Sequence, residues 1–388
     1  VARVGDVPAH VVGVDVQRGV LTQPGTDAVS EDPQRLQQPL LLVHRGHRDP
    51  DEGIGRRGTD EDSPKAGQIL TGQPQQGDQS GGNCVGNCPN TGGCLSWLEP
   101  GCVDPYTSAR NGSQGLLGPR FEVNGFTGVF PWPHAQRGQG GNQAFKRIQL
   151  RVDEINPSLP QNAGNVVLGE VTYTGRDDAL NNNQMNNTSH RRLNIGGVPP
   201  AFSITGSGST IRQQCAIQSW PNLTGGSAQV NMVPVPGEGR FWFGNNVRNN
   251  NDGTWTYIYA VHNQNSDRSG YKLTIPVPSS VTVTNINFRD VNYHSGEPVT
   301  NVDWAGVRTG STVEWTADAT FASNPNANAL RWGTSYTFEF TANSGPGDVT
   351  ANLQLFKTPD VISGTMRAPM ALVGLLGDMN CDGVVTVS

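Results

Sequence analysis

The sequence predicts an all-β protein built around an antiparallel β-sandwich, and three observations favour this fold class. Of the 388 residues, 49 are glycine and 27 are proline, and only 15% are charged. Glycine and proline mark turns, and few charged residues remain to form the solvent-facing sides of helices. Short runs of β-branched and aromatic residues, bounded by turn residues, recur along most of the chain.

Several of these runs alternate as strands with one buried side do. In Phe145–Val152, apolar side chains at every second position from Ile148 onward share one side, and basic and polar side chains share the other. Comparable segments are Val166–Thr174, Arg240–Phe243, Thr254–His262, Tyr271–Val277, Val281–Phe288, Thr312–Ala317, Tyr336–Thr341 and Ala351–Phe356. Strands joined by turns, without amphipathic helices between them, predict one large sandwich or two small ones over residues 105–360.

The first eighty residues differ in composition from the rest. Residues 1–80 contain no aromatic residue, cysteine, methionine or asparagine, whereas the remainder is rich in asparagine. A segment dominated by Arg, Gln, Gly, Asp and Pro cannot bury enough apolar surface to offset its chain entropy. We therefore expect residues 1–80 to be disordered. They are either a genuine polar extension or a segment translated out of frame from an incomplete gene, and we favour the second explanation.

Charge and hydropathy argue against two classes of partner. The net charge is −6 and the basic residues are scattered, so no basic stripe is available to neutralise the phosphates of a nucleic acid. No run of about 18 apolar residues occurs, so we expect no membrane span. The first thirty residues lack the charged, apolar and small-residue order of a signal peptide, so an extracellular or cell-surface location must be inferred from other features.

Residues 81–104 form a Cys-rich loop containing Cys84, Cys88, Cys94 and Cys102. Their spacing differs from the paired two-residue gaps of zinc ribbons, and no histidine lies nearby to complete a mixed site. We expect disulfides rather than zinc, with three possible pairings left open. Disulfides in a loop with almost no core of its own are typical of exported proteins.

The body offers no recognised catalytic motif, so we expect no enzymatic activity. The nearest approach to a reactive cluster is the segment Asp290–Glu297, with Asp303 behind it. Alternation places Asp290 and His294 on one side of a strand, which suits a hydrogen-bonded polar cluster or a cation site as well as catalysis. A carboxylate pair for glycoside hydrolysis could come from any two strands, and nothing singles one out.

Most tryptophans of the body, and Cys215, are assigned to the interior. Cys215 is expected to be a buried thiol rather than a reactive nucleophile, because no base is displayed near it in the sequence. The tryptophans that we expect to pack in the core rather than to stack on a ligand are Trp220, Trp242, Trp255, Trp315 and Trp332.

The chain ends, after a linker at residues 361–377, in a calcium-loop pattern over residues 378–388. EF-hand-type loops need oxygen ligands at positions 1, 3, 5 and 9, a glycine at position 6 and a backbone carbonyl at position 7. Counted from Asp378, position 6 is Gly383 and position 12, the bidentate acid, would follow Ser388. In this truncated form we therefore expect weak calcium binding or none.

This loop resembles the first repeat of type I dockerin domains, and the body resembles bacterial secreted proteins that end in such repeats. Carried over by position, the resemblance implies calcium ligands at Asp378, Asn380, Asp382, Val384 (through its carbonyl) and Thr386. It also implies a cohesin-like protein or a cell-surface matrix as partner.

Together these features predict a secreted or cell-surface structural or attachment protein with no catalytic activity, assembled through a calcium-dependent C-terminal repeat. The alternative is an extracellular protein that binds or degrades carbohydrate, with glycoside hydrolase as the enzymatic form. An open cleft lined by exposed aromatic residues and carboxylates would favour the alternative. A closed sandwich with its aromatic residues inside would favour the structural role.

Overall fold

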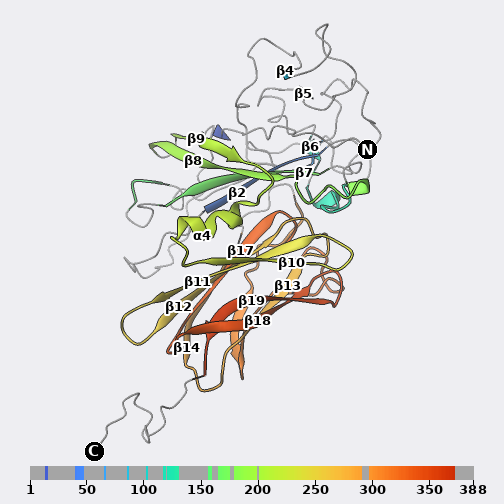
Figure 1. Ribbon diagram of the computed structural model, residues 1–388. Helices are drawn as coiled ribbons and strands as arrows, with labels where there is room; N and C mark the ends of the chain where they lie inside the picture. Colours follow the sequence, from blue (N-terminus) through green and yellow to red (C-terminus); the bar gives the residue numbers. More distant parts are fainter. Residues whose placement is uncertain are drawn as a thin grey trace, which may run out of the picture. The chain divides into compact units, whose positions relative to one another are not determined.

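The computed structural model describes residues 120–130, 156–159, 165–174, 179–198, 201–290 and 297–371, together with a few short strands outside these ranges. The chain divides into two compact units (Figure 1). The first unit comprises Val1–Ser219, Asn265–Asp267 and Asn292–Val299, and the second comprises Trp220–Gln264, Arg268–Val291 and Thr300–Ser388.

The first unit contains a five-stranded sheet in the order β1-β9-β8-β7-β2. Its strands are β1 (Val14–Asp15), β2 (Leu40–His47), β7 (Val167–Thr174), β8 (Thr188–Val198) and β9 (Ala201–Ile211). The β7–β8 and β8–β9 pairs are antiparallel, whereas β2 and β7 are parallel. This sheet is therefore mixed, a feature that alternation within single strands does not predict.

Short elements accompany this sheet. They are β3 (Lys65–Ala66) with β6 (Leu117–Gly118), β4 (Val85–Gly86) with β5 (Cys102–Val103), and the 3-10 helices η2 (Arg120–Glu122) and η4 (Ala216–Ser219). Strands β1, β2 and β3 fall within residues 1–80, but their side chains and the rest of that segment lie outside the described residues. The expectation of a disordered or out-of-frame segment stays a prediction.

The second unit is an antiparallel β-sandwich of two five-stranded sheets, in the orders β10-β11-β12-β17-β14 and β15-β16-β13-β18-β19 (Figure 1). The first sheet consists of β10 (Gln229–Pro234), β11 (Arg240–Asn249), β12 (Trp255–Asn263), β17 (Thr334–Ala342) and β14 (Val283–Arg289). The second consists of β15 (Ala305–Thr309), β16 (Thr312–Thr316), β13 (Gly270–Pro276), β18 (Pro346–Leu355) and β19 (Val361–Pro369). The predicted fold class is confirmed for this unit.

The predicted strands that fall in the described residues are all present, with shifted ends, whereas Phe145–Val152 lies outside them. Strands β8, β9, β10, β15 and β19 were not predicted, because glycine or polar residues interrupt their apolar pattern.

The second sheet ends later in the chain than the predicted body, which stops at residue 360. Because β19 pairs with β18 from Pro346↔Pro369 to Gln354↔Val361, the second sheet extends into residues 361–377, the segment assigned to a linker.

Alternation places large aromatic side chains between the two sheets. On β17, Tyr336, Phe338 and Phe340 point inward and are fully buried, while the residues between them are partly exposed. From the facing sheet, Trp315 packs with its ring centre 5.3 Å from that of Phe338. Such aromatic pairs contribute about 0.5–1.5 kcal/mol each beyond the burial of their area, so this layer is a main source of the sandwich's stability.

Side chains also bind carbonyl groups at the outer edges of the sheets. The Trp315 indole donates to Asn287 O on edge strand β14 at 3.0 Å. On edge strand β19, Thr365 O accepts from the Asn231 amide at 3.0 Å, and Arg367 O accepts from the Tyr259 hydroxyl at 2.9 Å. Because unpaired edge carbonyls invite pairing with other chains, these bonds make three edge carbonyls unavailable for such pairing.

A short helix covers part of the outer face of the first sheet. Helix α4 (Trp220–Leu223) places Trp220 against Ala228 and Ile258, and these three buried residues form a small apolar cluster separate from the main core. Trp220, Trp315 and Trp332 are buried, as the sequence predicts, whereas Trp242 and Trp255 are only half-buried.

Close approach of the two sheets requires glycine at position 364. A Cβ atom added there would lie 2.5 Å from Val233 Cγ2 and 2.9 Å from Phe243 Cδ2. We expect Gly364→Ala to lower the free energy of unfolding by about 1–3 kcal/mol through overpacking, measured by urea denaturation. Gly345→Ala is the matched control, because its Cβ would meet only Trp255 at 3.7 Å. Equal stability of the two variants would contradict this account of the core.

Candidate functional site

A cluster of buried polar residues in the first unit lies on one face of β7 and β8. Glu170 pairs across the sheet with His190, and Thr172 pairs with Thr188, so all four side chains share this face. Glu170 is 1% exposed and His190 is 2% exposed. The two threonine hydroxyls are hydrogen-bonded at 3.0 Å. Buried polar groups at paired positions make this face the best-defined candidate site among the described residues of the first unit.

Both ring nitrogens of His190 have hydrogen-bond partners. Nδ1 lies 3.0 Å from Gln214 O, and Nε2 lies 2.6 Å from Ser219 Oγ. Burial lowers the pKa of His190, so the ring is neutral at pH 7. A carbonyl oxygen only accepts, so the geometry assigns the proton to Nδ1, and Nε2 accepts from the Ser219 hydroxyl.

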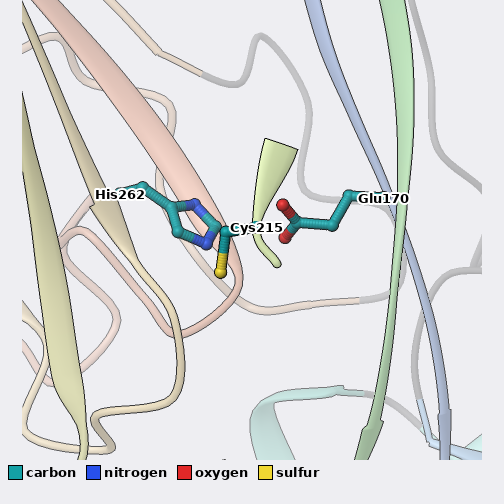
Figure 2. Close-up of side chains that lie close together, drawn as sticks. All are labelled: Glu170, Cys215 and His262. Carbon is teal, nitrogen blue, oxygen red and sulfur yellow. The ribbon is translucent and has the colours of Figure 1, made fainter. Parts of the chain in front are cut away.

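Glu170 and Cys215 adjoin the same 3-10 helix, η4. The Glu170 carboxylate accepts from the Ala216 N–H at 2.6 Å, and the Cys215 N–H donates to the Gln218 side chain at 2.8 Å. Figure 2 shows the carboxylate pointing from β7 toward Cys215, and a carboxylate oxygen and the sulfur lie within 4.8 Å of each other. Cys215 is a buried thiol rather than half of a disulfide, as the sequence predicts.

The chemistry of this cluster follows from its contacts. A serine hydroxyl bonded to a neutral imidazole is the starting arrangement of nucleophilic catalysis. The same bonds, with the Glu170 contact, also attach η4 to the sheet at both of its ends, and they use both ring nitrogens of His190. We therefore assign Glu170 and His190 a positioning role, because they supply hydrogen-bond partners to polar groups that are buried away from water.

The histidine of the second unit has a different environment. His262 (Figure 2) lies on β12 and is buried. Its Nδ1 lies 2.9 Å from Ser335 Oγ on the neighbouring strand β17. His262 and Ser335 are directly paired in the sheet register, so this contact is a cross-strand pair on the outer face of the first sheet of the sandwich.

The segment around Asp290 is a hydrogen-bonded polar cluster, one of the alternatives that the sequence left open. The Asn328 amide donates to the Asp290 carboxylate and, at 3.0 Å, to Val302 O. The Asn328 oxygen accepts from the Tyr336 hydroxyl at 2.6 Å, and the Trp304 indole donates to Asn328 O. His294 and Ser295 lie outside the described residues. Asn328 therefore anchors this end of the sandwich through bonds to several strands and loops.

The site residues proposed from the sequence lie outside the described residues. These are the calcium-loop positions Asp378, Asn380, Asp382, Val384 and Thr386, and the cysteines Cys84, Cys88, Cys94 and Cys102, of which Cys102 contributes only its backbone to β5. Calcium ligation and disulfide pairing at these positions stay predictions.

Sequence reasoning missed the cluster around His190. In sequence, Glu170, Thr172 and Thr174 alternate with Val171 and Tyr173, so they form the polar side of the strand. Such alternation predicts a solvent-facing polar side, so it indicates neither the burial of this face nor the residues that complete it. His190, Gln214 and Ser219 are brought there by strand pairing and by the turn before η4.

A scan against protein-family models and a search of curated proteins found no match to this chain. Among the described residues, no helix has the length and hydropathy needed to cross a membrane.

The lowered pKa of His190 makes stability depend on pH. An unfolded-chain histidine takes up a proton as the pH falls through about 6.5, whereas folded His190 does so only at lower pH because burial disfavours its charged form. The free energy of unfolding contributed by this residue is therefore complete at pH 8 and decreases as the pH falls below about 6.5 toward the folded pKa. We expect the β7 and β8 amides to lose protection against hydrogen exchange between pH 8 and pH 5.5, after correction for intrinsic exchange rates.

His190→Gln is the matched variant for this measurement, because glutamine keeps hydrogen-bonding capacity without titrating in this range. Glu170 and Cys215, the other ionisable groups at η4, remain in both proteins. Protection in His190→Gln should change less between the two pH values. The same change in both proteins would show that His190 is not the group responsible.

Proposed function

We propose that this chain is a secreted or cell-surface structural or attachment protein without catalytic activity, and that a calcium-dependent C-terminal repeat mediates its assembly. The observation that carries the proposal is the closed β-sandwich of the second unit. Catalytic and small-ligand sites are concave and lined by exposed apolar and polar groups. In a closed sandwich, the outer faces and the loops are the surfaces available for contact with a partner. Such surfaces suit a load-bearing or adhesive module.

The distribution of aromatic residues supports this role. The largest fully buried side chains include Trp304, Trp315 and Tyr257. None of the tryptophans in the described part of the chain is exposed, and the exposed aromatic residues there are Phe121 and Phe321, each 38% exposed. A sugar-binding cleft would need aromatic rings open to solvent near carboxylates.

The outer face of the second sheet is mostly polar. Glu314, Thr274, Asn352 and Ser363 form one cross-strand row across four strands. Ser363 donates to the Asn352 oxygen at 2.7 Å, and Glu314 forms an ion pair with Lys272 at 3.4 Å. A face with many hydroxyl and amide groups suits contact with a hydrated matrix. Its exposed valines, Val307 and Val361, lie on opposite edge strands, β15 and β19, rather than in one apolar patch.

The alternative function is binding or degradation of carbohydrate, including glycoside hydrolysis. A sedimentation assay separates the two functions. The protein is mixed with isolated cell-envelope material and with insoluble polysaccharides, and both the bound fraction and the released reducing ends are measured. The attachment role predicts binding to the envelope material without release of reducing ends. Release of reducing ends above that of a heat-denatured sample would establish the hydrolase alternative, and failure to bind envelope material would contradict attachment.

Calcium binding by residues 378–388 can be tested by supplying the acid at loop position 12. We expect one glutamate added after Ser388 to tighten calcium binding about tenfold or more, because the charge and number of oxygen ligands set the affinity of such loops. Isothermal titration with calcium chloride measures the change. The control carries glutamine at the same added position. Equal affinities in the two proteins would contradict the calcium-loop assignment.

A further inference from the structure

The amide of Asn245 lies inside the apolar core of the second unit. On β11, Phe241 and Phe243 point into the core, and alternation places Asn245 on the same side. The next residue on that side, Val247, also packs against the core. Asn245 is 0% exposed, and within the described part of the chain neither its nitrogen nor its oxygen has a hydrogen-bond partner.

The neighbours of Asn245 across the sheet are polar. It pairs with Gln229 on β10 and with Tyr259 on β12, and directly paired side chains on one face lie within reach of each other. Tyr259 is fully buried, and its hydroxyl donates to Arg367 O at 2.9 Å. Burial raises the pKa of Tyr259 well above its ordinary value, so the hydroxyl stays protonated and its oxygen can still accept a hydrogen bond.

This row adjoins the line where β10 meets β19, which we call the polar seam (Ser227, Gln229, Asn231, Thr365 and Arg367). With the Gln229 amide oriented so that its oxygen faces the guanidinium of Arg367, that oxygen accepts from Nη2 at 2.9 Å and from Nε at 3.2 Å. Arg367 Nη1 also donates to Ser227 O at 3.4 Å, and Asn231 donates to Thr365 O at 3.0 Å. The polar groups of the seam therefore have protein hydrogen-bond partners. Asn245 lies beside the seam without a hydrogen bond to any described residue.

A fully buried amide without hydrogen bonds is strongly unfavourable, and buried polar groups that lack protein partners are commonly satisfied by ordered water. Folded proteins hold about one buried water per 27 residues, each with two to four hydrogen bonds, so a sandwich spanning Gln229–Pro369 is expected to hold several. The Asn245 amide supplies a donor and an acceptor, and Tyr259 supplies a further acceptor. These groups supply the polar partners that such a water needs.

We propose that the Asn245 amide binds an ordered internal water within the sandwich, with Tyr259 and Gln229 as the polar groups beside it. The site takes neutral water rather than an ion, because the sheet neighbours of Asn245 are uncharged and the Arg367 guanidinium is bonded to Gln229 and Ser227. Through Tyr259, which reaches Arg367 O on β19, the water connects β11 of one sheet with the edge strand of the other. This inference is independent of the function proposed for the chain.

A crystal structure of the protein at about 1.5 Å resolution tests the proposal directly. The expected result is a peak of electron density about 2.7–3.2 Å from an Asn245 amide atom, also within bonding distance of a second polar protein atom. If the amide instead bonds directly to protein groups, or if no such density is present, the proposal is overturned.

Thermal unfolding supplies a second, independent readout. In Asn245→Leu the amide and its water leave together, so no protein group loses its partner, and the melting temperature should stay within about 2 °C of wild type or rise. If Asn245 bonded directly to protein groups, the leucine would leave those groups unsatisfied and lower the melting temperature markedly. That decrease would contradict the water site.

Asn328→Leu is the matched control. Asn328 is also 0% exposed in the same sandwich, but its amide bonds to Asp290, Val302 and Tyr336. Its replacement should lower the melting temperature by about 5–15 °C, because buried partners lose their bonds. The contrast between two buried asparagines separates loss of a bound water from loss of protein hydrogen bonds.

Discussion

The placement of Trp315 between the two sheets is the constraint on which much of the second unit depends. Its ring is fully buried and packs against Tyr259, Phe338 and Phe340, while its nitrogen binds the edge strand β14. The same ring excludes any Cβ at Gly306, whose added atom would lie 2.7 Å from the indole nitrogen. Trp315 thus contributes to the core, binds a backbone carbonyl on edge strand β14 and requires glycine where β15 approaches β14.

The core accommodates polar groups by giving most of them a fixed protein partner. The Tyr257 hydroxyl donates to Ser344 O, the Tyr259 hydroxyl donates to Arg367 O, and Asn328 bonds in several directions. These bonds connect strands of both sheets, so they favour one arrangement of the strands over others. Asn245 departs from this pattern, and the proposed water restores it. Closure of the core and satisfaction of its polar groups together support a structural module.

The first unit follows a different principle on the face of β7 and β8. Instead of aromatic rings, Glu170 and His190 bind backbone and side-chain groups around η4. Such a face depends on the protonation state of its members, whereas the aromatic core does not.

The sequence by itself determined that the body is β-rich, that strands such as β16 and β17 have one buried side, and that Trp315 and Cys215 are interior residues. Alternation with period two reports these features because it depends only on neighbours along the chain. The tertiary structure alone decided which strands pair. Only register joins Glu170 to His190 and puts Asn245 beside Tyr259. Glycine-rich β8 and β9 and the late strand β19 likewise form because partner strands and a facing sheet stabilise them, and such long-range contacts leave no local pattern in the sequence.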